Sequence, residues 1–213
     1  MKRCVIVGGA GVKEYEKVRG ALRENDVFVF CDCGLKHMEA LGVKPDLIVG
    51  DFDSHENPHM EAETIVLPRA KDDTDTVFAA KEMMKRGFEE FLLVGVIGDR
   101  LDHTLANVSI LLMLDTAGKR AKAIDDFSEM EIISAAEGRP GRASIEDRYP
   151  YFSLLNITGE AGGITIRGAK FPLENGQIDC DYQYAVSNEV LPGKTAEVTI
   201  EKGRLLLIRV TAQ

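Results

Sequence analysis

Aspartate residues cluster in two short segments whose spacing could place several carboxylates around one ligand. Asp51 and Asp53 stand two positions apart in VGDFDS (49–54), directly after an apolar run, so both can reach the same side of an extended segment. A second segment, KDDTDT (71–76), adds three more aspartates where a helix is expected to begin. Two like charges about 4 Å apart repel by about 4 kcal/mol at an effective dielectric constant of 20. If the two segments meet, either some carboxylates are protonated or a divalent cation lies between them.

The oxygen-only character of these side chains favours a hard cation. Mg²⁺ is typically held by a few carboxylates together with water and substrate phosphates, so the pattern indicates metal-assisted transfer of a phosphate-containing group. The alternative for 71–76 is an ordinary helix start. There, Asp72, Asp73 or Thr74 would cap the helix, and the helix dipole would favour the acidic residues.

A third polar segment, GDRLDHTLAN (98–107), combines a cation with a helix start. Arg100 is a planar donor that can grip two phosphate oxygens at once. Asp102 and His103 open the predicted helix, where backbone N–H groups favour an anion. His103 could either move a proton or cap and pack the helix start. The glycine-rich segment at 8–11 lacks the third glycine of GxGxxG, which argues against a dinucleotide fold.

Short apolar runs alternate with segments of helical period up to about residue 133, and these elements must position the polar groups. The runs lie at 4–7, 27–31, 46–50, 64–67 and 91–96, followed by 121–125 and 129–134. This alternation predicts right-handed crossovers and a parallel sheet covered on both faces. Asp32, Asp51 and Arg100 each follow one of these runs. We therefore expect them on one rim, at the carboxyl ends of the strands, where such sheets bind ligands.

The pattern changes at 135–149, which is polar, rich in Gly, Pro and Arg, and without helical period. Beyond it, strand-like runs are punctuated by Gly, Pro and Asn, and no convincing helix remains. We expect an α/β domain over residues 1–134, a linker over 135–149 and a small β-sandwich over 150–213. A sandwich of this size buries little surface alone, so it should pack on the first domain or on another subunit.

Composition excludes several classes of function. The 213 residues include 26 Lys and Arg against 35 Asp and Glu, a formal charge of −9, which disfavours a nucleic-acid binder. No apolar run is long enough to span a membrane, and the first is too short for a signal peptide. Cys31 and Cys33, which flank Asp32, form either a metal or redox pair or simple strand packing. We expect a reduced, cytoplasmic protein.

Taken together, six segments of the chain resemble the thiamin pyrophosphokinase family. They are CDCG (31–34), KPDLIVGDFDS (44–54), KDDTDT (71–76), GDRLDHTLAN (98–107), GAKFPL (168–173) and VSNE (186–189). The resemblance spans nearly the whole chain. It implies an α/β nucleotide domain joined to a C-terminal β-sandwich. It also implies a homodimer that moves pyrophosphate from ATP to thiamin with Mg²⁺.

The resemblance further implies roles for individual residues, in overlapping sets. The metal set is Asp51, Asp53 and Asp75. The catalytic set is Asp51, Asp53, Asp75, Arg100 and Asp102. The ATP-binding set is Asp32, Asp73, Thr74, Arg100 and His103. The thiamin-binding set is Asp102, Ser187 and Asn188, in a site formed between two subunits.

Two departures from the family pattern stand out. Cys33 occupies a position at which the family has Gly, which would alter how closely the backbone approaches a ligand. The chain has no Trp, so an aromatic platform for thiamin would have to come from a Phe or Tyr, and Phe171, Tyr182 and Tyr184 are candidates.

Two other functions remain open at this point. One is a pyrophosphokinase for a different hydroxymethyl acceptor, such as a pterin, although the Ser187–Asn188 segment favours thiamin. The other is a non-catalytic nucleotide-binding module whose β domain serves only for dimerisation. That second alternative leaves the clustered aspartates without an explanation.

Overall fold

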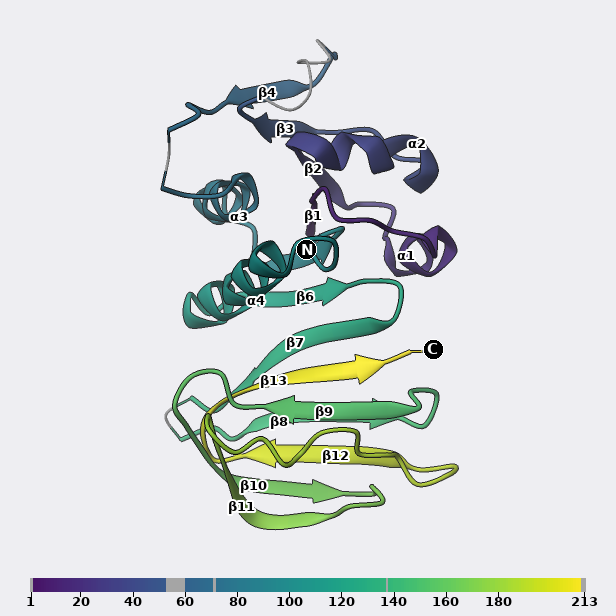
Figure 1. Ribbon diagram of the computed structural model, residues 1–213, viewed down its shortest axis with the longest axis vertical. Coiled ribbons are helices and arrows are strands. Elements are labelled where there is room, and N and C mark those ends of the chain that lie inside the picture. Colours follow the sequence, from purple (N-terminus) through teal and green to yellow (C-terminus); the bar gives the residue numbers. More distant parts are fainter. Residues whose placement is uncertain (1, 53–59, 71, 137, 212–213) are drawn as a thin grey trace. The chain divides into compact units, whose positions relative to one another are not determined.

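The chain forms two compact units, and the boundary between them in the sequence falls after Asp126 (Figure 1). The computed structural model describes residues 2–52, 60–70, 72–136 and 138–211. Unit 1 spans Met1–Asp126 and unit 2 spans Phe127–Gln213. No helix in these described ranges is long and apolar enough to cross a membrane.

Unit 1 is built on a parallel sheet. Its strands are β1 (Cys4–Val7), β2 (Val27–Cys31), β3 (Leu47–Gly50), β4 (Glu63–Val66), β5 (Glu90–Val94) and β6 (Arg120–Ile124). They lie in the order β4-β3-β2-β1-β5-β6, and every neighbouring pair is parallel. The central strand β1 is fully buried because both faces of the sheet are covered. The α/β prediction is confirmed.

Helices cover the two faces of this sheet. They are α1 (Tyr15–Ala21), the 3-10 helix η1 (Asp32–His37), α2 (Met38–Leu41), α3 (Asp75–Lys85) and α4 (Leu101–Thr116). Figure 1 shows α1 and α2 on one side of the sheet and α3 and α4 on the other. Thr74 caps α3 by accepting a hydrogen bond from the Val77 N–H at 3.3 Å, as one of the sequence alternatives proposed. Gly42 ends α2 in the left-handed conformation that glycine adopts readily.

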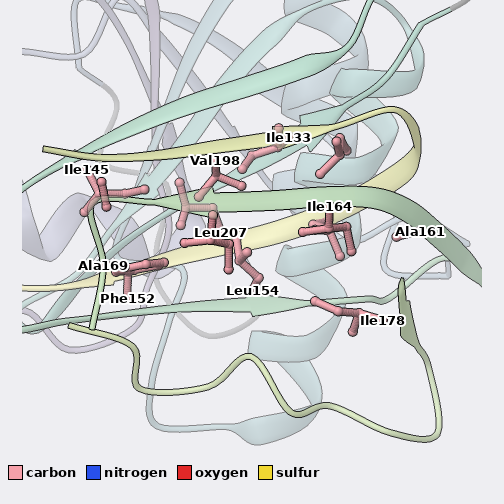
Figure 2. Close-up of a cluster of buried hydrophobic side chains, with 14 of the residues drawn as sticks. Ile133, Ile145, Phe152, Leu154, Ala161, Ile164, Ala169, Ile178, Val198 and Leu207 are labelled. Atoms are coloured by element: carbon pink, nitrogen blue, oxygen red, sulfur yellow. The ribbon is translucent and has the colours of Figure 1, made fainter. Parts of the chain in front are cut away.

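Unit 2 is a β-sandwich. Its strands are β7 (Ser128–Ser134), β8 (Gly141–Glu146), β9 (Tyr151–Leu155), β10 (Glu160–Arg167), β11 (Leu173–Asp179), β12 (Thr195–Ile200) and β13 (Lys202–Val210). Two antiparallel groups, β7-β13-β9 and β8-β12-β10-β11, enclose one apolar core. Figure 2 shows this core, to which Phe152 and Leu207 from the first group and Ile164 and Val198 from the second contribute.

Two details of the sequence prediction are wrong. The expected first domain ended at 134, but β7 pairs along its length with β13 and so belongs to unit 2. The expected linker at 135–149 contains β8, which pairs with β12. Both strands pair with strands that are distant in the sequence, so local pattern does not reveal to which unit they belong. The run at 64–67 forms most of the edge strand β4, whose residues are half-buried or exposed.

A buried ion pair stabilises the parallel sheet of unit 1 at the amino-terminal ends of its strands. Arg3 and Asp26, which precede β1 and β2, are 7% and 9% exposed. The guanidinium donates to both carboxylate oxygens, at 3.0 and 2.6 Å, and to the Ala21 carbonyl at 2.7 Å.

Replacing Asp26 by Ala should lower the free energy of unfolding by about 3 kcal/mol or more, because the guanidinium would be left buried without its counter-ion. Urea denaturation measures this loss. Glu16→Ala, which breaks an exposed ion pair with Arg19, is the control and should cost less than about 1 kcal/mol. Equal losses in the two variants would contradict the assignment.

A close approach between η1 and the end of β1 requires glycine at position 34. A Cβ added there would lie 2.2 Å from the Val7 carbonyl oxygen, which is backbone and cannot move away easily. Gly34→Ala should therefore lower the free energy of unfolding by about 1–3 kcal/mol, as expected for overpacking.

The matched control is Gly20→Ala in α1, where an added Cβ meets nothing within 4 Å. This change should leave stability unchanged or raise it by up to about 1 kcal/mol, because Ala favours a helix more than Gly does. Thermal unfolding of the two variants tests the pair. A Gly34→Ala protein as stable as the Gly20→Ala protein would refute the close contact.

Candidate active site

A cleft of about 520 Å³ opens at the carboxyl ends of the strands of unit 1. Its walls come from the loops that follow β1, β2, β3 and β5 and from the starts of α3 and α4. The strand order runs outward from β1 through β2 to β4 and then returns to β5 on the other side of β1. This reversal is the place at which open parallel sheets bind ligands.

The cleft brings together most of the predicted site residues. Those that line it are Asp32, Asp51, Asp73, Thr74, Asp75, Arg100 and His103. Asp53 lies outside the described residues. Asp102 stands beside the cleft without lining it, and Ser187 and Asn188 belong to unit 2. Residues predicted from separate parts of the sequence thus line one cavity.

Contacts around Cys31 and Asp32 show how closely the aspartate-bearing segments approach. Burial raises the pKa of the Cys31 thiol well above its ordinary value, and the nearby carboxylates of Asp75 and Asp32 raise it further. A Cβ added to Gly50 would lie 3.3 Å from the Cα of Asp32. The end of β3, which leads into Asp51, therefore lies against Asp32.

Asp32 has an unusual backbone conformation and an unusual hydrogen-bonding environment. Its φ of 38° is in the left-handed region, as are those of Phe52 and Asp99 at 53° each. Such conformations cost on the order of 1 kcal/mol or more in non-glycine residues and concentrate at functional sites. The Oδ2 atom of Asp32 accepts a hydrogen bond from the Cys33 thiol at 3.2 Å. Its Oδ1 atom is buried and has no hydrogen-bond partner among the described residues.

Carboxylate oxygens, which are the usual ligands of hard cations, line the cleft. Asp51 and Asp75 supply carboxylate oxygens to the same cleft, and the buried Oδ1 of Asp32 lacks a donor in the described part of the chain. Within the described ranges, no three His, Cys, Asp or Glu side chains converge closely enough to hold a metal ion. Asp53, the third member of the predicted metal set, is not among the described residues.

Arg100 and Asp102 form an exposed ion pair at the rim. The Arg100 Nη2 donates to the Asp102 Oδ2 at 2.6 Å, and Nε donates to Oδ1 at 3.2 Å. This hydrogen bonding holds the pKa of Asp102 below its usual range. Asp102 is therefore a weak proton acceptor and a good orienting group for the guanidinium.

Ser187 and Asn188 have structural contacts within unit 2. Asn188 is 4% exposed and pairs through its backbone with Phe152. Its side chain accepts a hydrogen bond from the Phe171 N–H at 3.1 Å and donates to the Phe171 carbonyl at 2.7 Å. Ser187 is exposed, has a φ of 57°, and donates its N–H to the Ser153 hydroxyl. Their contact with thiamin stays a prediction.

The cleft also contains residues outside the predicted catalytic, ATP-binding, thiamin-binding and metal sets, although Asp72 and Asp99 stand in the polar segments singled out from the sequence. Arg69, Asp72, Asp99 and Asn107 also line the cleft. Asp99 accepts a hydrogen bond from the Gly11 N–H at 2.7 Å, and Asn107 donates to the Val96 carbonyl at 2.7 Å. Asn107 lies one turn after His103 on the same face of α4, so helical periodicity could have indicated it. The Asp99 contact joins segments far apart in the chain and has no local pattern.

None of the four cysteines forms a disulfide bond. Cys31 is buried in β2, which agrees with strand packing. The Cys33 Cβ lies 2.7 Å from the position that a Cβ on Gly9 would occupy, so this side chain packs directly on the glycine-rich loop. Burial raises the pKa of the Cys33 thiol, and its hydrogen bond to Asp32 raises it further.

Comparison with known proteins identifies two family models in the chain. The model for the catalytic domain of thiamin pyrophosphokinase matches residues 18–123, and the model for its vitamin B1 binding domain matches residues 142–205. A thiamine pyrophosphokinase of Bacillus subtilis is 26% identical over 219 aligned positions, which cover 99% of this chain and 100% of that protein.

Solved structures share the fold. The crystal structure of thiamine pyrophosphokinase from Bacillus subtilis matches with a TM-score of 0.85 at 20% identity, covering 100% of both chains. The enzyme from Geobacillus thermodenitrificans matches with a TM-score of 0.82 at 23% identity over 100% of this chain and 99% of the other. The Candida albicans protein gives 0.76 at 15% identity over 98% and 88%. With both domains matched in order and the predicted aspartates gathered in the first, the chain belongs to the thiamin pyrophosphokinase family.

Proposed function

We propose that this protein transfers the pyrophosphoryl group of ATP to the hydroxyl of thiamin, giving thiamin diphosphate and AMP. The observation that carries the proposal is the gathering of Asp32, Asp51 and Asp75 in one cleft at the reversal point of the sheet. Three separate segments supply these carboxylates, and a shared triphosphate ligand with its cation accounts for their proximity.

Magnesium is the cation that this set of side chains would hold, through Asp51, Asp75 and Asp53. When bound, Mg²⁺ neutralises charge on the phosphate oxygens of ATP. The high negative charge of the cleft supports this role, because a triphosphate would otherwise be repelled by the aspartates that surround it.

The chain's own residues position the reacting groups. The thiamin hydroxyl oxygen attacks the β-phosphorus of ATP, the bond from that phosphorus to the α-phosphate oxygen breaks, and AMP leaves with that oxygen. Arg100 donates hydrogen bonds to the charge that develops on the leaving side. Thr74 and the first N–H groups of α3 lie at the cleft and favour a phosphate there. Asp73 is held in place by Lys81 at 2.7 Å.

Unit 2 would provide the thiamin site, with two subunits of a cytoplasmic homodimer joining to complete it. Exposed aromatic side chains support this role. Phe171 is 59% exposed and Tyr182 is 69% exposed, and the Tyr182 and Tyr184 rings lie 5.5 Å apart between centroids. Asn188 anchors the backbone of Phe171, so it would orient this aromatic ring toward the acceptor.

Asp51→Asn tests the role of the aspartates. Release of AMP from ATP should require thiamin, and the variant should turn over about 100-fold more slowly than the wild type at limiting Mg²⁺, since loss of a charge-stabilising group costs this order. The matched control is Glu24→Gln at the amino-terminal edge of the sheet, which should retain wild-type rates. Wild-type activity in Asp51→Asn would refute the metal role. A pterin acceptor that reacts faster than thiamin would refute the substrate.

Asp102→Asn distinguishes orientation from proton abstraction. If Asp102 only orients Arg100, kcat should fall by about tenfold or less, whereas loss of a general base costs about 100-fold or more. Because Arg100 keeps the pKa of Asp102 below its usual range, the wild-type rate should show no acid limb from this group near neutral pH. Rate measurements across pH in both proteins test this. A loss above 100-fold that removes an acid limb would make Asp102 the base.

A further inference from the structure

His37 is a buried histidine that lies outside the cleft and has both ring nitrogens engaged. It is 2% exposed. Its Nε2 lies 2.8 Å from the Ala10 carbonyl oxygen, and its Nδ1 lies 2.6 Å from the Tyr15 hydroxyl. A carbonyl oxygen can only accept, so Nε2 carries the proton and Nδ1 accepts from Tyr15. The two contacts together fix one neutral tautomer.

The segment that His37 contacts forms one wall of the cleft. Gly8, Gly9 and Ala10 line the cavity directly after β1. The Ala10 carbonyl faces the buried ring of His37, and the Gly9 carbonyl accepts from the Lys36 ammonium at 2.5 Å. Both carbonyls are therefore held by η1, the same short helix that begins with Asp32.

The N–H groups of this segment are held from the opposite side. Ala10 donates to the Gly95 carbonyl at 2.8 Å, and Gly11 donates to the Asp99 carboxylate at 2.7 Å. The peptide groups of the loop are thus oriented by two neighbours, η1 for the oxygens and the loop after β5 for the N–H groups. The Ala10 carbonyl and the Gly11 N–H belong to one peptide group, so loss of either neighbour would remove one of the two hydrogen bonds that fix its orientation.

Rotation of the Ala10 peptide would matter because the cleft is already acidic. A released carbonyl oxygen needs a new partner and would be free to turn toward the cavity, where its partial negative charge opposes a phosphate. We infer that His37, with Tyr15 as its hydrogen-bond donor, is a positioning residue that keeps the Ala10 carbonyl out of the nucleotide site and so sets the affinity for ATP. This inference rests on the proposed function.

The charged groups around His37 agree with a neutral ring. Burial lowers the pKa of His37, and Lys36 on its own helix lowers it further. The Ala10 carbonyl and Asp99, from the loops after β1 and β5, act in the opposite direction. Tyr15 faces the ring from α1. Since burial is the largest of these effects, the ring donates to Ala10 as a neutral group at neutral pH.

The test compares His37→Leu, His37→Gln and Tyr15→Phe. His37→Leu should raise the KM for ATP about tenfold, the effect of losing one oriented hydrogen bond, with kcat and the KM for thiamin within about twofold of the wild type. His37→Gln should recover most of the loss because its amide nitrogen can donate to Ala10. Tyr15→Phe should raise the KM by about threefold, since the ring keeps its donor but loses the group that fixes it.

Asp26→Ala is the matched control, because it destabilises the same sheet at the amino-terminal ends of the strands, away from the cleft. It should lower the melting temperature without changing the KM for ATP. Circular dichroism verifies that each variant is folded, and the Gln and Phe variants keep the test decisive if the Leu variant does not fold. An unchanged KM in both of these, or an equal rise in Asp26→Ala, would overturn the inference.

Direct binding of a non-hydrolysable ATP analogue with Mg²⁺, measured by calorimetry, separates this inference from the proposed function. If the wild type binds the analogue but forms no thiamin diphosphate, the proposed function fails while the ratio of dissociation constants still tests His37. A ratio near one between His37→Leu and wild type would overturn the positioning role. A wild type that binds no nucleotide would overturn both.

Discussion

Several aspartate side chains that repel one another lie close together in unit 1, and the sheet has to hold them there. Carboxylates gather at the cleft only because the strands that deliver them are fixed in a parallel sheet whose central strand is fully buried. The free energy released by burying these apolar strands opposes the repulsion. A site of this kind is stable as long as the sheet beneath it is, and the buried Arg3–Asp26 pair stabilises the far end of that sheet.

The glycine-rich loop after β1 also depends on other segments of unit 1 for its conformation. Its conformation is set by hydrogen bonds from three other parts of unit 1. Asp126, for example, accepts from the N–H groups of Lys13 and Glu14 and so holds the start of α1. The loop therefore has a rigid shape although its own sequence, rich in glycine, would permit many.

Much of this could be read from the sequence, and the reason lies in local pattern. The apolar runs and helical periods that form β1 to β6 and α3 to α4 are properties of neighbouring residues, and strand ends in a parallel sheet share one edge. The convergence of Asp32, Asp51 and Arg100 follows from that rule, whereas the approach of Asp75 at the start of α3 does not. The same rule places Asp99, which follows β5, at this edge of the sheet. The hydrogen bond between Asp99 and Gly11 and the contacts of His37 could not be found in this way, because they join segments whose distance in the sequence carries no period. For the same reason, pattern alone assigned β7 to the wrong unit, since its partner β13 lies at the other end of the chain.

The left-handed backbone at Asp32 and Asp99 limits which amino acids these positions accept. Branched side chains such as Val, Ile or Thr clash with the main chain in this conformation, whereas Asn adopts it at least as readily as Asp. Amide replacements at the two positions would thus remove a formal charge and preserve the path of the polypeptide. Kinetic differences between such neutral analogues and the parent would report electrostatics free of conformational disturbance, a separation that few acidic sites permit.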